Sequence, residues 1–274
     1  MIEIPEAVIL SQQITKHLKG KKIKNAAAMH SPHKLVWTFK DPKNYRKMLV
    51  GRSIIESYPF GSTVEISCGK VRMAFSEGFY LRYFKAGSKL PEKHQLSLEF
   101  EDGDFFVAWV QMYGGLACFE KNEYGNKYYL IAKEKPAVMS KEFSVSYWKL
   151  LFAPDVEKLS AKAFLATEQR IPGLGNGVLQ DILFNAKIHP KRKIETLSQQ
   201  ERNNLYKVVI STLKEMVNRG ARDTEKDLLG NDGGYKTKMS VKTIGSPCPV
   251  CHGTIKKMAY MGGSVYVCET CQKL

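Results

Sequence analysis

Four of the six cysteines lie within the last 27 residues and form two C-x-x-C pairs separated by sixteen residues. Each pair can direct two thiolates at one ion, and this spacing is typical of a four-cysteine zinc site. Because protein ligands would fill all four tetrahedral positions, the predicted zinc is structural and not catalytic. Two disulfides are the alternative, which a reducing cytoplasm disfavours. The predicted ligands are Cys248, Cys251, Cys268 and Cys271.

The N-terminal stretch "MIEIPE" places two carboxylates, Glu3 and Glu6, on either side of Pro5 and ahead of an apolar-periodic run. Proline suits the first turn of a helix, so this stretch predicts a helix start. The two glutamates either carry chemistry or only begin that helix, and their spacing leaves both interpretations open.

A third motif is the turn "PGLGN", which joins two segments of helical periodicity. Gly173 and Gly175 permit close backbone approach, and Asn176 begins a helix whose free N–H groups attract an anion. In a basic protein, such a turn between helices suggests phosphate binding. The alternative is an ordinary helix cap.

The charge balance supports a polyanionic partner. The chain carries 42 Lys and Arg against 27 Asp and Glu, a formal net charge of +15. Each phosphate that such a surface neutralises releases a condensed counterion, which favours nucleic acid as the partner. A lysine-rich surface without a nucleic-acid partner is the alternative. With no apolar run long enough to span a membrane and no signal peptide, we expect a cytoplasmic, nucleoid-associated monomer.

The pattern of elements predicts an α+β fold. Residues 1–130 contain a leading helix and short runs rich in Val, Phe and Tyr, as in a β-sandwich. Residues 131–150 are expected to be a connector, and 151–240 a helical domain. Residues 241–274 form the zinc finger, with a hairpin around Gly262–Gly263.

Two details refine the helical part. One helix is predicted to begin with a capping box, Ser198 and Glu201, and to end at Gly220. The polar, glycine-rich residues 219–247 predict a long loop before the zinc finger, and loops of this length are often functional or disordered.

Together these motifs resemble the formamidopyrimidine-DNA glycosylase / endonuclease VIII family of base-excision enzymes. The resemblance is strongest in "IPGLGNGVLQDILFNAKIHPKRK", which looks like the family's helix–two-turn–helix signature. It extends to the terminal "SPCPVCHGTI…CETCQK" and to "MIEIPE", which is similar to the family's opening M-P-E-L-P-E. The resemblance implies double-stranded damaged or abasic DNA lying between two domains, with the damaged base flipped out of the stack.

The resemblance also implies roles for individual residues. Lys162 and Asn176 match family positions that contact phosphates around the lesion. Glu3 and Glu6 match the two glutamates behind the family's nucleophile, one of which assists ring opening and proton transfer.

Several family positions differ in this chain. The nucleophilic proline is replaced by Ile2, so Met1 is expected to be retained, and its amine is the remaining candidate nucleophile. The family's hairpin lysine falls on Ser62, and the arginine of its zinc finger is replaced around Gly263. The void-filling stretch D-P-R-R-F-G becomes "VQMYGG", residues 110–115.

Three hypotheses follow. The chain is a DNA glycosylase with AP-lyase activity that uses an unusual amine, or a non-catalytic protein that binds damaged DNA on a glycosylase scaffold. The third, an RNA-binding zinc-ribbon protein, agrees with the charge, but the helix–turn–helix argues against it. The first two differ in whether a nucleophilic amine lies within reach of Glu3.

Overall fold

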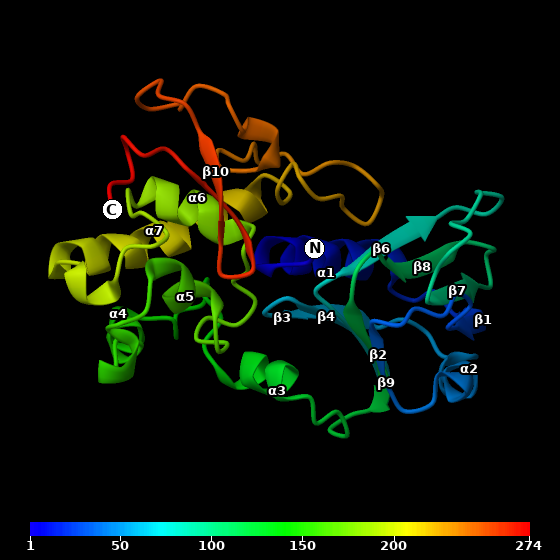
Figure 1. Cartoon of the computed structure of the whole chain (residues 1–274). Helices are drawn as coiled ribbons and strands as arrows, with labels where there is room; N and C mark the ends of the chain where they lie inside the picture. The colour runs from blue at the N-terminus through cyan, green and yellow to red at the C-terminus, as the bar shows by residue number, and fades with distance from the viewer.

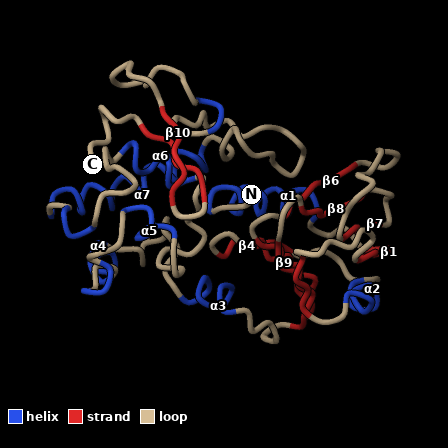
Figure 2. Tube along the Cα trace, viewed as in Figure 1, coloured by secondary structure: helices blue, strands red, loops and turns tan.

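The computed structural model describes all residues, 1–274, and divides into a strand-rich half and a helix-rich half (Figure 2). Helix α1 (Ile4–Leu18) lies between the two halves (Figure 1). Pro5 lies in its first turn, and the helix ends before Gly20, whose φ of 84° favours glycine. Ile4 packs into the core of the helical half, whereas Leu10, Ile14 and Leu18 pack into the core of the sandwich. Helix α1 therefore joins the two cores.

The sandwich consists of two sheets. The five-stranded sheet has the order β2-β9-β5-β4-β3 and the four-stranded sheet the order β1-β7-β8-β6. All pairs are antiparallel except β2 with β9. The strands are β1 (Ile23–Ala28), β2 (Val36–Phe39), β3 (Glu56–Phe60), β4 (Thr63–Cys68), β5 (Val71–Ser76), β6 (Phe79–Phe84), β7 (Leu96–Phe100), β8 (Phe105–Val110) and β9 (Gly114–Glu120).

Alternating side chains along these strands build the core between the sheets. Ile66 of β4 and Phe75 of β5 face Leu98 and Phe106 of the other sheet, and all four are fully buried. Cys118 lies in the same core, where burial raises the pKa of its thiol to about 12. Cys118 therefore packs as a small apolar side chain.

Two short helices complete this half. Helix α2 (Tyr45–Leu49) closes one end of the sandwich core, and helix α3 (Lys127–Glu134) follows the last strand. Tyr129 of α3 packs on the outer face of the five-stranded sheet, against Ala74, Ala117 and Phe119.

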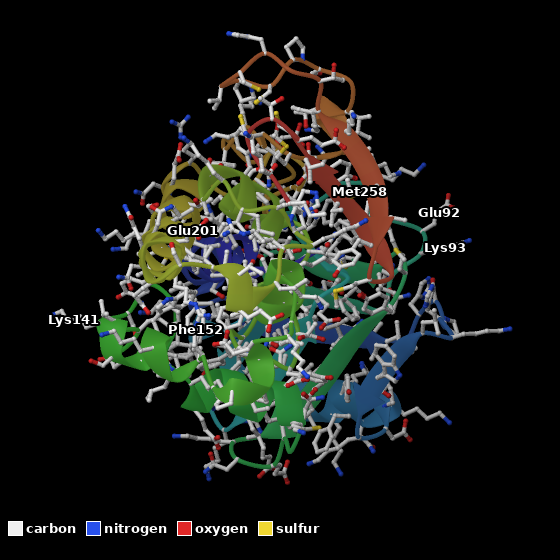
Figure 3. The ribbon with its side chains drawn as sticks, turned by 60° about the vertical axis from the view of Figure 1, so that its left-hand side comes forward. Glu92, Lys93, Lys141, Phe152, Glu201 and Met258 are labelled. Atoms are coloured by element: carbon white, nitrogen blue, oxygen red, sulfur yellow. The ribbon has the colours of Figure 1, made fainter.

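The helical half contains α4 (Val145–Leu150), α5 (Ala161–Ala166), α6 (Val178–Asn185) and α7 (Gln199–Asn218). Its core includes Trp148, Phe164, Leu183 and Leu213, which are all buried. Short 3-10 turns occur at Pro42–Asn44, Pro154–Val156, Ile194–Thr196 and Val241–Thr243. Figure 3 shows Phe152 and Glu201 in this half, with Lys141 at its periphery and Glu92 and Lys93 at the periphery of the molecule.

The hairpin of β10 (Lys256–Tyr260) and β11 (Gly263–Val267) packs on α6 (Figure 1), and Figure 3 shows Met258 on it. Met261 and Gly262 form its turn with φ values of 51° and 69°, as a tight hairpin turn with two left-handed residues requires. The predicted hairpin is thus present, with its turn one residue earlier.

The stretch between α7 and the hairpin is well anchored. Leu228 is fully buried in the sandwich core, and Tyr235 is buried in the helical core. The amide of Leu228 donates to Gln13, and its carbonyl accepts from the amide of Tyr83. The expected loop is therefore an ordered strap that crosses from one core to the other.

The α+β fold class predicted from the sequence is confirmed, with a sandwich, a leading helix, a helical domain and a cysteine-rich hairpin. The expected connector at 131–150 contains the end of α3 and all of α4. No helix in the structure is long and apolar enough to cross a membrane.

Candidate nucleic-acid interface

The carboxylate of Glu3 lies at the N-terminus of α6. The amides of Gly177 and Val178 donate to its two oxygens over 2.8 and 2.7 Å. Glu3 is buried, and the helix dipole favours an anion at this point. Two of the free N–H groups at the start of α6 are therefore occupied by a carboxylate of the same chain.

The two glycines of the "PGLGN" turn lie where the N-terminal and helical parts of the chain come into close contact. A Cβ at Gly173 would lie 2.2 Å from the carbonyl carbon of Gly61, and one at Gly175 would lie 2.7 Å from the carboxyl group of Glu3. The groups that approach these two glycines in the structure are protein atoms, and DNA binding by Gly173 and Gly175 stays a prediction. Ser62 follows Gly61 at this contact.

Glu6 forms a buried ion pair with Arg222. Arg222 Nη2 donates to Glu6 Oε2 over 2.7 Å and Nε donates to Oε1 over 2.9 Å, while Nη1 lies 3.7 Å from Glu3 Oε2. Burial acts to raise the pKa of Glu6, but the charge and hydrogen bonds of Arg222 outweigh it, so the pKa is lowered. Burial acts to lower the pKa of Arg222, and the two glutamates more than reverse this effect. Both partners are therefore held in their charged forms.

The N-terminal amine is also engaged. The Met1 ammonium lies 2.5 Å from Glu225 Oε2, and the carbonyl of Met1 accepts from Arg222 over 3.3 Å. Burial raises the pKa of Glu225, although the amine and Arg222 oppose that shift. The Ile2 nitrogen is an amide that donates to the Glu77 carbonyl over 2.7 Å, and Ile2 is 4% exposed. The atom at the family's nucleophile position is thus a buried amide nitrogen.

Lys162 and Asn176 come together at the terminal hairpin. Lys162 Nζ donates to the carbonyl of Tyr260 over 2.6 Å, and Asn176 Nδ2 donates to the carbonyl of Ser264 over 3.0 Å. A Cβ at Gly263 would lie 3.5 Å from Lys162 Nζ and 3.6 Å from Asn176 Nδ2. Three distant parts of the sequence therefore meet at one point.

Lys162 is a buried cation without an acidic partner. Its residue is 5% exposed, no carboxylate lies within 4.0 Å of its ammonium, and burial lowers its pKa. A buried charge normally has a counter-charge, because removing an ion from water is costly. This buried positive charge favours an anion beside Lys162 and Asn176.

The four terminal cysteines could bind one metal ion. Their Sγ atoms all lie within 4.8 Å of one another, and two of the separations are 3.3 and 3.8 Å. Four ligands at about 2.3 Å from a tetrahedral zinc ion would be about 3.8 Å apart. A disulfide requires about 2.05 Å, and all four thiols are free. The cluster therefore fits a metal site better than two disulfides.

The stretch 110–115 runs from the last residue of β8 through the turn 111–113 into the first residues of β9. Met112 is 64% exposed, and Tyr113 contacts Trp37 edge to face with ring centroids 6.1 Å apart. No positively charged side chain lies in this turn, in contrast to the family motif.

Sequence reasoning missed Arg222 and Glu225. Both lie in the stretch between α7 and the hairpin, where no periodicity or spacing distinguishes them from other polar residues. The charge of Arg222 offered no signal in a chain with 42 basic residues.

Comparison with known proteins shows that the chain is similar over its whole length to other proteins. A family model, "Formamidopyrimidine-DNA glycosylase H2TH domain", matches residues 136–227. Formamidopyrimidine-DNA glycosylases of Polynucleobacter necessarius and Listeria innocua are 27% and 28% identical, and each comparison covers 100% of both chains. The fold is similar to that of Lactococcus lactis Fpg in a complex with DNA containing an abasic site. That comparison has a TM-score of 0.83 at 22% identity and covers 99% of this chain and 100% of the other.

Proposed function

Because this chain belongs to the formamidopyrimidine-DNA glycosylase family, we propose that it binds damaged duplex DNA and does so without the family's Schiff-base reaction. The observation that carries the binding function is Lys162, a buried ammonium without an acidic partner. A DNA phosphate supplies the missing counter-charge, and the amide of Asn176 is positioned to donate to the same group.

The arrangement at the N-terminus supports binding without reaction. The nitrogen of Ile2 has no free electron pair for attack, because it is an amide. The Met1 amine is held in an ion pair by Glu225 over 2.5 Å, so it is not free to approach a sugar. Glu3 and Glu6 are engaged by the α6 amides and Arg222, so neither carboxylate is free to move a proton at a sugar.

A glycosylase with AP-lyase activity is the second candidate function. One observation favours it: Met1 offers a primary amine, and the adjacent Glu225 has a raised pKa and can accept a proton.

Zinc belongs to the same proposal. Two C-x-x-C pairs with four converging thiols match the ligand set of a structural zinc ion. Such an ion would hold the hairpin in place, and the hairpin contacts Lys162 and Asn176.

We expect Lys162→Ala and Asn176→Ala to weaken DNA binding, because each removes a donor to phosphate. The loss for Lys162→Ala is about tenfold or more, and the slope of log K against log salt falls by about 1. Binding of damaged and undamaged duplexes is measured by fluorescence anisotropy over a series of salt concentrations. Lys141→Ala, which removes an exposed lysine at the periphery, is the matched control and is expected to bind as the unmodified protein does. Unchanged binding in both site variants would remove the phosphate assignment.

We expect borohydride to trap no covalent complex between the protein and a duplex with an abasic site, although the two bind tightly. The N-terminal mass is checked first, because retention of Met1 decides which amine is present. A trapped adduct that maps to Met1 would instead establish the second candidate function, since only a Schiff base is reduced to a stable bond. The same duplex is assayed for strand cleavage in parallel.

A further inference from the structure

A second lysine beside the Lys162 site also lacks an acidic partner. Lys191 belongs to the stretch "HPKRK", which lies between α6 and the 3-10 turn Ile194–Thr196. Lys191 is half-buried, and no carboxylate lies within 4.0 Å of its ammonium. Neither Lys162 nor Lys191 therefore has a counter-charge within ion-pair distance.

Backbone hydrogen bonds fix Lys191 next to the first turn of α5. The amide of Lys162 donates to the carbonyl of Pro190 over 3.0 Å, and the amide of Ala161 donates to the carbonyl of Arg192 over 2.8 Å. Lys191 is the residue between these two carbonyls. The two lysines thus start from adjacent points of the backbone, although they belong to separate parts of the chain.

Both ammonium groups lie against the same aromatic ring. Lys162 Nζ lies 5.9 Å and Lys191 Nζ lies 5.4 Å from the ring centroid of Tyr260, within the range of cation–π attraction. Because both distances are measured to one point, the two ammonium groups are at most about 11 Å apart. The Tyr260 carbonyl also accepts from Lys162 Nζ over 2.6 Å. One residue of β10 therefore contacts both cations.

The turn of the terminal hairpin contributes no charge of its own at this point. It consists of Met261 and Gly262, and Gly263 follows, so none of these side chains can donate to a phosphate. The turn is attached to the start of α5, where Ser160 Oγ donates to Met261 Sδ over 3.7 Å. Since Tyr260 directly precedes this turn, the hairpin places a ring, and not a cation, beside the lysines of the helical half.

We propose that Lys191 is a second phosphate-binding residue and that Tyr260 positions Lys162 and Lys191 for one DNA strand. This inference rests on the proposed binding of damaged DNA. Successive phosphates of a strand are separated by about 3.4 Å along the helix axis, so two ammonium groups at most about 11 Å apart can neutralise neighbouring phosphates. The hairpin then acts on DNA through the ring of Tyr260, which holds two cations of the helical half.

The first test is the salt dependence of binding, measured by fluorescence anisotropy. Lys191→Ala is expected to weaken binding of every duplex about tenfold and to lower the slope of log K against log salt by about 1. The double variant with Lys162→Ala is expected to lower the slope by about 2. Lys193→Ala is the matched control, because it removes an exposed lysine that donates to the carbonyl of Lys158, and its slope is expected to stay unchanged.

The second test addresses the ring of Tyr260. Tyr260→Leu keeps the backbone carbonyl but removes the ring, and it is expected to weaken binding about fivefold. Tyr260→Phe keeps the ring and is expected to bind as the unmodified protein does. Tyr260→Leu combined with Lys191→Ala should weaken binding by less than the product of the two single losses, because both changes remove the same contact. Thermal unfolding is measured for every variant, and Lys191→Ala leaves the hairpin intact should Tyr260→Leu loosen it.

The outcomes that contradict this inference differ from those that contradict the proposed function. If Lys162→Ala lowers the slope and Lys191→Ala does not, Lys191 binds no phosphate and the proposed DNA binding stands. An equal change for Lys191→Ala and Lys193→Ala would mean that overall charge is responsible. If Tyr260→Phe binds as weakly as Tyr260→Leu, or the two losses multiply fully, the positioning role is wrong. If the unmodified protein binds no duplex, the proposed function itself fails.

Discussion

Replacing Arg222 by methionine is expected to lower the free energy of unfolding by about 3–5 kcal/mol, because it leaves two buried carboxylates without their cation. Glu6 loses both of its bonds to the guanidinium, and Glu3 keeps only the two amides of α6. The strap between α7 and the hairpin also loses its attachment to the Met1 carbonyl. Urea unfolding followed by circular dichroism measures the change.

A second substitution isolates the buried charge as the cause. The double variant carries both Arg222→Met and Glu6→Gln. It has one uncompensated buried charge fewer than Arg222→Met alone, so part of the lost stability is expected to return. Arg219→Met is the matched control, because Arg219 is exposed and its only ion pair is with Glu215 on the same helix. Its cost is expected to be about 0.5 kcal/mol or less. Equal losses for Arg219→Met and Arg222→Met would contradict the explanation.

The pH dependence of the free energy of unfolding is an independent test of the same ion pair. The folded pKa of Glu6 is lowered from 4.5, so its stabilising contribution is present above that pH and is lost as the pH falls through the folded pKa. In Arg222→Met, only burial and weaker contacts act on Glu6, so its pKa is expected to rise. Acidification from pH 7 to 5 should then increase the stability of the variant relative to the unmodified protein.

Local sequence patterns predicted the elements well. The short runs rich in Val, Phe and Tyr between residues 63 and 112 correspond to β4–β8, because such side chains favour strands. The capping box at Ser198 and Glu201 correctly predicted the start of α7, since both hydrogen bonds are local. The cysteine spacing predicted the cluster because each pair is close in sequence.

The chemistry of the N-terminus could not be predicted in the same way. Glu6 and Arg222 are separated by 216 residues, and their contact depends on the path of the strap across both cores. The glycine turn predicted an anion at the start of α6, and Glu3, 174 residues away from Gly177, places its carboxylate there, while phosphate binding at this turn stays a prediction. Likewise, a cavity of about 840 Å³ beside the five-stranded sheet is lined by residues of β2, β3, α3 and the turn before α6. Such sites arise from tertiary contacts that have no period in the sequence.

Disrupting the four-cysteine cluster, for which we propose zinc, is expected to have the largest effect on DNA binding. Binding of structural zinc provides folding free energy of about 10–16 kcal/mol in small zinc fingers. The packing of Cys248 and Cys268 with Phe184 and Met239 is too small a core to replace it. Cys268→Ala should therefore unfold residues 241–274 and weaken binding of every duplex at least tenfold, since the hairpin no longer contacts Lys162 and Asn176.

The remainder of the protein should stay folded when this cluster is lost, because the sandwich and the helical half have cores of their own. Metal content by mass spectrometry is expected to fall from one ion per chain to none, and limited proteolysis should cleave within residues 241–274 only. Cys118→Ala is the matched control: it removes a buried thiol from the sandwich core and should keep both the ion and the DNA affinity. A metal-free Cys268→Ala protein with full affinity would instead mean that Lys162 and Asn176 bind phosphate without the hairpin, and the terminal unit would then have no part in DNA binding.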